Sequence, residues 1–418
     1  MSSSSNFDDF VRMAIFSSEH QFTFLVGAGI SMNPPSCIPS AVQFVKTILD
    51  LCIPPEEIEA IMKLPHLRYE LLIEKFKIYF DEKLHFLDYL ELIKQPNLIH
   101  FFLASAMLYK NYVVTTNFDF LIEEALRKIL LTTEEYQITP VITREDFDRD
   151  FSPYDAVSQD LYPIYKIHGS KKNIITGEDT TGSLVTTMGS LGKDRGIGET
   201  FALEGFKQQP FYNLIKGRSL IVMGYSGSDD FDIAPILKAL PRIEQLIWIE
   251  HSFEPGFSIE KIESIPKDAP KDIRKSTKLL RDIYSRIPIP IYQIFADTQD
   301  IVQKILWPLI LPEIPLFNSE FLPEGEKMPI FQQWVSQEFH ESLPNDIQKY
   351  EFSCSLYADF KLWKALERNA EKGITLAKQN ADIRSQMRFI NYLGKSQMAQ
   401  HDSYKALEHF QAGIIIAQ

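Results

Sequence analysis

Short apolar runs alternate with helix-like spacing over the first three quarters of the chain. The runs are rich in Val, Ile, Phe and Tyr and occur at Phe22 to Val26, Tyr112 to Thr116, Tyr162 to Ile167, Ser219 to Gly224, Gln245 to Glu250 and Ile291 to Ala296. Helical patterns follow some of them, as at Phe120 to Leu131 and Ile233 to Leu240. This alternation predicts an α/β fold with a doubly wound, Rossmann-like parallel sheet. In such sheets the ligand crevice lies at the carboxyl ends of the strands.

The same pattern divides the chain into three parts. We expect a sheet domain over residues 1–311 with a helical cap or insertion at about 41–110, a proline-marked linker over 312–345, and a helical region over 346–418. In that last part, Ala365 to Ala377 matches Ala406 to Ala417, about 40 residues further on. The match resembles tetratricopeptide-type hairpins, although a plain helical bundle stays open. Because two units bury little core, we expect either an array truncated at Gln418 or one that docks on a partner.

Composition narrows the classes of function. The 418 residues are 45% hydrophobic and carry a net charge of -13, which supports a large core and disfavours nucleic acid held by charge alone. The three cysteines lie far apart, so neither a disulfide framework nor a zinc site is indicated, and we expect no metal. The start lacks a basic leader, and no apolar stretch reaches the roughly 18 residues of a membrane span. We therefore expect a soluble, cytoplasmic protein with no membrane partner.

The first strand ends in a glycine turn with the sequence GAGIS, Gly27 to Ser31. Two glycines allow a tight turn and a close approach to a pyrophosphate, which the N-terminus of a following helix would then bind. The third glycine of the dinucleotide motif is missing, because Met32 takes its place and Pro34 and Pro35 follow. An ordinary strand-to-loop turn is therefore an equal alternative for this segment alone.

Three other strand ends carry polar motifs. The second strand runs into Thr115 to Asp119, the third into Ile167 to Ser170, and a later strand into Gly224 to Asp230. For Asn117 and Asp119 the alternative is an Asx turn that caps the next helix, and the serines of the turns could likewise be helix caps. The remaining histidines show no metal-ligand spacing, so we interpret them as structural: His66, His85, His100, His401 and His409.

Taken together, the motifs resemble the sirtuin superfamily. The matching elements are GAGIS, T-x-N-x-D at Thr115 to Asp119, the pair His168 and Gly169, and the G-x-S turn at Gly224, over about residues 10–310. The resemblance implies NAD+ as the ligand, with His168 as general base and Asn117 fixing the nicotinamide ribose. The expected cofactor-binding residues are Gly27, Ala28, Gly29, Ser31, Thr116, Asp119, Gly169, Gly224, Ser226 and Glu250.

Departures from the deacylase pattern point to hydrolysis of NAD+. Deacylating sirtuins carry two C-x-x-C pairs for zinc between the H-G and G-x-S motifs, and here the segment from Gly169 to Gly224 contains no cysteine. What remains resembles the zinc-free sirtuin-like domains of bacterial antiviral proteins, which cleave NAD+ to nicotinamide and ADP-ribose. Since imidazole has a pKa near 6.5, His168 suits the base role, and the amide of Asn117 can orient the ribose or a water.

The resemblance leaves several alternatives open. A sirtuin-like domain could transfer an acyl or ADP-ribosyl group, or could bind NAD+ or ADP-ribose as a scaffold without turnover. A redox dehydrogenase is disfavoured because no acidic ribose ligand stands where that fold requires it. Because constant hydrolysis of NAD+ would be toxic, we expect an autoinhibited homo-oligomer that a phage component or partner protein activates through the helical region.

Overall fold

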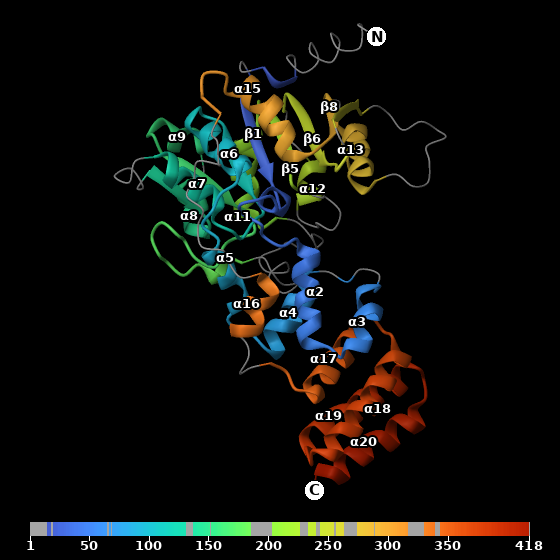
Figure 1. Ribbon diagram of the computed structural model, residues 1–418. Helices are drawn as coiled ribbons and strands as arrows, with labels where there is room; N and C mark the ends of the chain where they lie inside the picture. Colours follow the sequence, from blue (N-terminus) through green and yellow to red (C-terminus); the bar gives the residue numbers. More distant parts are fainter. Residues whose placement is uncertain are drawn as a thin grey trace. The chain divides into compact units, whose positions relative to one another are not determined.

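The described part of the chain forms one large sheet with helices on both faces and a separate helical unit (Figure 1). The computed structural model describes residues 15–17, 20–64, 67, 69–130, 137–150, 152–184, 203–225, 233–239, 243–254, 256–262, 274–287, 289–316, 330–338 and 343–417. Two compact units divide the chain: residues 1–40 with 87–328, and residues 41–86 with 329–418.

The described residues of the first unit build an eight-stranded sheet in the order β3-β4-β2-β1-β5-β6-β8-β7. Its strands are β1 (Phe22–Val26), β2 (Tyr112–Thr115), β3 (Ile138–Val141), β4 (Tyr162–Lys166), β5 (Ser219–Met223), β6 (Gln245–His251), β7 (Phe257–Lys261) and β8 (Ile291–Ala296). All neighbours pair in parallel except β7, which is antiparallel to β8. The doubly wound α/β fold expected from the sequence is confirmed, and β3 and β7 are the two strands that the apolar runs did not indicate.

Helices and short helical turns make up the rest of this unit's secondary structure within the described residues. They are η1 (Ala28–Ser31), α5 (Tyr89–Leu92), α6 (Leu98–Leu108), α7 (Leu121–Ile129), α8 (Arg144–Arg149), α9 (Pro153–Ser158), η4 (Thr181–Ser183), α11 (Gly205–Ile215), α12 (Ile233–Lys238), α13 (Lys275–Arg286), α14 (Thr298–Ile301), η5 (Val302–Leu306) and α15 (Trp307–Ile310). A short helix, η2 (His85–Asp88), spans the boundary between the two units.

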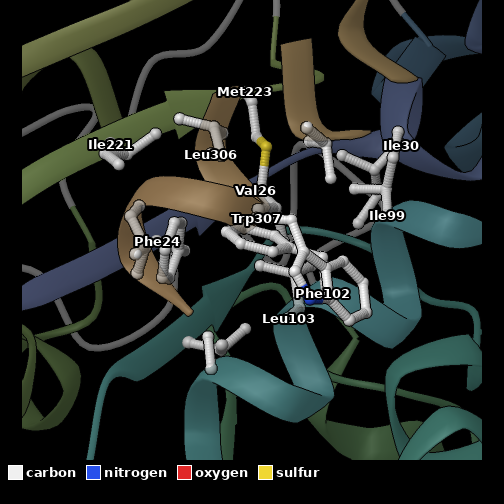
Figure 2. Close-up of a cluster of buried hydrophobic side chains, with 14 of the residues drawn as sticks. Phe24, Val26, Ile30, Ile99, Phe102, Leu103, Ile221, Met223, Leu306 and Trp307 are labelled. Atoms are coloured by element: carbon white, nitrogen blue, oxygen red, sulfur yellow. The ribbon is translucent and has the colours of Figure 1, made fainter. Parts of the chain in front are cut away.

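Successive side chains of each strand point to opposite faces of the sheet, where they belong to two separate hydrophobic cores. On β1, Phe24 and Val26 point to the face covered by α6, α7 and α14 to α15, where Phe102 and Trp307 pack against them (Figure 2). Leu25 points to the opposite face, which α8, α11, α12 and α13 cover. A sheet buried on both faces explains why its central strands read as continuous apolar runs.

The phosphate-binding helix expected directly after GAGIS is not formed. Only the four-residue 3₁₀ turn η1 follows β1, and residues 32–40 are turns and extended chain. The prolines explain this, because Pro34 and Pro35 lack the N–H groups that a continuing helix needs. The peptide bond between these two prolines is cis. Any anion site at this turn therefore lacks a long helix behind it.

The second unit is entirely helical within the described residues. Its helices are α2 (Ala41–Cys52), α3 (Pro55–Met62), α4 (Tyr69–Tyr79), α16 (Phe331–Glu338), α17 (Asp346–Asp359), α18 (Trp363–Gln379), α19 (Ile383–Ala399) and α20 (Ser403–Ala417). Residues 41–86 thus group with the C-terminal helices, whereas α6, expected in the same insertion, packs on the sheet. Likewise α16 is a helix within the segment expected as a linker.

Two chain segments meet inside this unit. Phe44 of α2 packs on Phe331 of α16 with ring centroids 4.2 Å apart, and Phe80 lies 5.3 Å from Phe352 of α17. Glu57 of α3 is buried and accepts hydrogen bonds from Tyr357 Oη at 2.5 Å and from Arg368 Nη2 at 2.8 Å. These contacts make residues 41–86 part of the helical unit's core.

The last three helices repeat with a period of twenty residues. Each follows a turn residue with positive φ, namely Lys361, Ala381 and His401, and helices α18, α19 and α20 begin two residues later. A 40-residue hairpin is longer than the roughly 34 residues of tetratricopeptide units. The internal match of the sequence therefore corresponds to alternate helices of one array.

No helix within the described ranges is long and apolar enough to cross a membrane.

Candidate functional site

Four parallel strands end at the same level of the sheet, and β6 passes this level and continues for two more residues. Val26 of β1 pairs with Thr115 of β2 and with Met223 of β5, and the same register extends to Lys166 of β4 and Ile249 of β6. The residues that follow these positions are Gly27, Thr116, Ile167, Gly224 and Glu250. The motifs singled out in the sequence therefore meet along one edge, where the crevice of an open α/β sheet lies.

The two glycine turns at this edge pack backbone against backbone. The Gly29 N–H donates to Gly224 O at 2.8 Å, and a Cβ built on Gly27 would lie 2.7 Å from Gly224 O. A Cβ on Gly224, whose φ is +64°, would lie 2.5 Å from Ile30 N. Contact with the neighbouring turn is thus one physical reason for these glycines, and a role for Gly27 or Gly29 at a phosphate stays a prediction.

Asn117 and Asp119 form a hydrogen-bonded cluster with Ser31. Asp119 Oδ2 accepts from Ser31 Oγ at 2.8 Å and from Asn117 Nδ2 at 3.1 Å, while Asp119 Oδ1 accepts from Leu121 N at 3.1 Å. Asp119 therefore both accepts from the first N–H of α7 and takes part in the cluster, although the N-cap position itself is Phe120. The side chain of Asn117 does not cap the helix, because its acceptor Oδ1 takes no main-chain N–H within the described residues, while its Nδ2 is directed to Ser31 and Asp119.

One buried acceptor of this cluster has no partner among the described residues. Asn117 is 5% exposed, and its Oδ1 atom makes no hydrogen bond there. Ser170 Oγ, next to the His168 turn, is a second such atom. A buried, unpaired polar atom is costly in a folded protein unless a ligand or water satisfies it. Asn117 Oδ1 and Ser170 Oγ are therefore the two polar atoms near these strand ends that a polar ligand or a water would satisfy.

His100 joins this cluster, although the sequence analysis assigned it to structure alone. Its Nε2 lies 3.1 Å from Ser31 Oγ, and its Nδ1 accepts from the Asn97 N–H at 3.1 Å. Complete burial lowers the pKa of His100 from 6.5 to about 4, so the ring is neutral at physiological pH. The readable signal was the capping box at the start of α6, with Asn97 as the cap and His100 three residues later.

His168 lies half-buried in the turn that ends β4. The following Gly169 has φ +78°, and its position is tight, because a Cβ there would lie 2.2 Å from Ser183 O. The Ser170 N–H donates to Ser183 Oγ at 3.1 Å, which ties the turn to η4. Ser183 of η4 thus holds the main chain next to His168.

Two buried lysines donate hydrogen bonds to main-chain oxygens near the strand ends. Lys166 Nζ donates to the main-chain oxygen of Asp119 and lies 3.1 Å from Glu123 Oε1. Lys207 Nζ donates to Ile167 O at 2.9 Å and pairs with Glu204 at 2.6 Å. Burial raises the pKa of Glu123, an effect that the charge of Lys166 opposes. Each ammonium group is neutralised by a carboxylate and fixes a carbonyl beside Asn117 or His168.

The positions of the remaining expected ligand residues give less information about a ligand. Thr116 is half-buried and its N–H donates to Val26 O at 3.0 Å, and the side chain of Ala28 is exposed. Glu250 accepts from Trp248 Nε1 at 3.3 Å, within its own strand. Ser226 lies outside the described residues. In the described part of the chain no group of three or more His, Cys, Asp or Glu could hold a metal ion.

A comparison with known families identifies residues 111–252 as similar to a SIR2-like domain. The match starts just before β2 and ends just after β6, so it contains Asn117, Asp119, His168, Gly224 and Glu250 but not GAGIS. No curated protein matches the chain. The sirtuin-like character of this region supports an NAD-related function and indicates an enzyme that uses NAD+.

Proposed function

We propose that the protein hydrolyses NAD+ to nicotinamide and ADP-ribose. The observation that carries the proposal is the buried Oδ1 of Asn117, which has no partner among the described residues and lies at the end of β2 in the region similar to a SIR2-like domain. In this reaction the bond between nicotinamide and its ribose breaks, the electron pair leaves with nicotinamide, and water adds to the ribose carbon. The enzyme must therefore hold the ribose and accept one proton from the water.

The residues present fit that requirement. Asn117 Oδ1 can only accept, so it suits a ribose hydroxyl or the attacking water. His168, in the half-buried turn after β4, is the group we assign to accept the proton. The absence of cysteine between Gly169 and Gly224 argues against the zinc module of deacylases. Hydrolysis asks for no acyl-lysine groove and so suits these residues better than deacylation.

Turnover of NAD+ tests the proposal. Purified protein, alone and with candidate activators, is incubated with NAD+, and nicotinamide and ADP-ribose are quantified. We expect Asn117→Ala and His168→Ala to lower the rate by at least about a hundredfold, because each removes a reacting or positioning group. His409→Ala, a histidine of α20 in the helical unit, is the matched control and should retain the rate.

The products separate the competing reactions. Free ADP-ribose in a one-to-one ratio with nicotinamide supports hydrolysis. Label on protein would favour ADP-ribosyl transfer instead, and loss of acyl groups from a peptide would favour deacylation. Full activity of both site variants would overturn the assignment of Asn117 and His168.

For the biological role we propose depletion of NAD+ in phage-infected cells by a homo-oligomer that an infection signal activates through the helical unit. The resemblance to zinc-free antiviral sirtuin-like domains and the attached helical array support this role. We expect cells with the wild-type protein to lose NAD+ during phage challenge, and cells with His168→Ala to keep it. Light scattering before and after activation measures the assembly. A monomer that consumes NAD+ constantly without harming its host would contradict the role.

A further inference from the structure

The N-terminus of α6 contacts the GAGIS turn through two side chains. Asn97 Nδ2 donates to Ile30 O at 2.7 Å, and His100 Nε2 reaches Ser31 Oγ at 3.1 Å. Ile99, between them in sequence, belongs to the same apolar cluster as Ile30 (Figure 2). The main chain of Ile30 and the side chain of Ser31 are therefore both fixed by one helix end.

We propose that His100 is a positioning residue that acts through Ser31 to hold the Asn117 amide with its Oδ1 directed at the ligand. The proposal rests on the NAD+ site proposed above. It adds to that site a group that touches no substrate and that sets the direction of the hydrogen bonds in the cluster.

The chain of bonds has only one consistent direction. The Asn97 N–H can only donate, so His100 Nδ1 is an acceptor and carries no hydrogen. A neutral ring then has its hydrogen on Nε2, and this group donates to Ser31 Oγ. The neutral state follows from the burial that lowers the pKa of His100 to about 4.

Ser31 passes this direction on to the carboxylate. Its hydroxyl has one hydrogen, and with His100 donating to its oxygen, that hydrogen goes to Asp119 Oδ2 at 2.8 Å. Asn117 Nδ2 donates to Asp119 Oδ2 at 3.1 Å and lies 3.3 Å from Ser31 Oγ. Turning the amide around would place Oδ1 against a carboxylate oxygen, so Oδ1 stays directed away from Asp119, without a partner in the described chain.

Capping of α6 does not account for the whole arrangement. The capping box uses only Nδ1 of His100, and an asparagine at that position could make the same bond. The contact of Nε2 with Ser31 lies on the other side of the ring. The two functions of the side chain can therefore be separated by substitution.

Two substitutions make that separation. His100→Asn keeps an acceptor near the place of Nδ1 but ends short of Ser31, whereas His100→Gln carries an amide donor out to the distance of Nε2. We expect both to fold. His100→Asn should bind ADP-ribose about tenfold more weakly in calorimetry, the scale of one hydrogen bond, and His100→Gln should recover most of that loss.

A double-mutant cycle tests whether His100 acts through Asn117. If it does, His100→Asn should weaken ADP-ribose binding little further in a chain that already carries Asn117→Ala. Independent, additive losses would show a general structural role and overturn the proposal, as would equal binding by the Asn and Gln variants.

Ring nitrogen spectra supply a readout that needs no ligand. Nitrogen-15 spectra of the histidine rings should show His100 as the neutral tautomer with hydrogen on Nε2 at pH 6. A charged ring, or hydrogen on Nδ1, would overturn the proposal about His100. Lack of any ADP-ribose binding by a wild-type protein with the expected tautomer would instead overturn the proposed NAD+ site.

Discussion

Gly224 shows how much a single residue constrains the edge of the sheet. Its φ of +64° strains any side chain, and a Cβ would also lie 2.5 Å from the main-chain nitrogen of Ile30. The GAGIS turn and the turn after β5 can therefore approach each other this closely only because glycine stands at the points of contact. This backbone contact places η1, and with it Ser31, beside the strand ends.

We expect Gly224→Ala to destabilise the protein by more than about 3 kcal/mol, from backbone strain of about 1–2 kcal/mol together with overpacking. Gly177→Ala is the matched control, because Gly177 also has positive φ, +77°, but no atom of the described residues lies within 4 Å of its Cβ position. It should cost only the backbone strain. Denaturant unfolding of both variants measures the difference, and equal losses would contradict the packing argument.

His100 also makes a specific prediction about stability and pH. The unfolded chain binds a proton at this ring near pH 6.5, whereas the pKa in the folded state is about 4. The unfolded state therefore takes up more protons as the pH falls between these values, and the folded state loses stability. The stabilisation is complete above pH 6.5 and falls by about 3 kcal/mol on acidification to pH 4.

The difference between wild type and His100→Asn isolates this effect from other titrating groups. Between pH 7 and pH 4, the unfolding free energy of the wild type should fall by about 3 kcal/mol more than that of His100→Asn. Parallel curves would mean that the ring does not change its protonation on unfolding over this range.

At the scale of elements, the sequence predicted the centre of the sheet better than its edges. The bounds of β1 and β8 agree with the apolar runs, because strands buried on both faces are continuously apolar. The missed strands β3 and β7 are the two edges. Pro140 interrupts β3, which an edge strand tolerates, and β7 is half-buried to exposed.

Within the site, local sequence indicated residues and could not supply their partners. The motifs placed Asn117, Asp119 and His168 at strand ends because chain order and strand ends are readable locally. The contacts of His100 with Ser31 and of Lys207 with Ile167 join residues 69 and 40 positions apart. Such pairings depend on how helices pack across the sheet, which a single sequence does not reveal.

In the helical array, two glycines leave room for an aromatic ring of the next helix. A Cβ on Gly373 of α18 would lie 2.3 Å from the ring of Phe389, and one on Gly394 of α19 would lie 2.4 Å from Phe410. Gly413 of α20 differs, since its Cβ position meets only Ile390 at 3.6 Å. A side chain would therefore clash at the glycines of α18 and α19, whereas the glycine position of α20 has room for one.

We expect Gly394→Ala to destabilise the helical unit by about 1–3 kcal/mol through overpacking against Phe410. Gly413→Ala should instead stabilise it by about 0.5–1 kcal/mol, because alanine favours the helix and the space is open. Thermal unfolding monitored by circular dichroism compares the two variants. A loss of stability at both positions would show that α20 does not pack as described.

At the scale of the whole molecule, the helical unit is assembled from two segments that the sheet unit separates in sequence. Glu57 in the first segment receives its hydrogen bonds from Tyr357 and Arg368 in the second, and its side chain is 3% exposed. Glu56 also pairs across the segments, with Tyr350 and Lys372, but it is 48% exposed. Glu57 therefore connects the two segments from a buried position, and Glu56 connects them from an exposed one.

Removal of Glu57 should loosen both segments at once. Glu57→Ala leaves the buried Tyr357 hydroxyl without its acceptor, which costs about 1–3 kcal/mol, whereas Arg368 loses its partner but is 54% exposed. Hydrogen exchange should accelerate in α2 to α4 and in α17 to α19 together, while strands β1, β2 and β5 of the other unit exchange as in the wild type. Glu56→Ala should change exchange little, since exposed pairs contribute less than about 1 kcal/mol. Acceleration confined to residues 41–86 would mean that these helices do not share one cooperative unit with the C-terminal array.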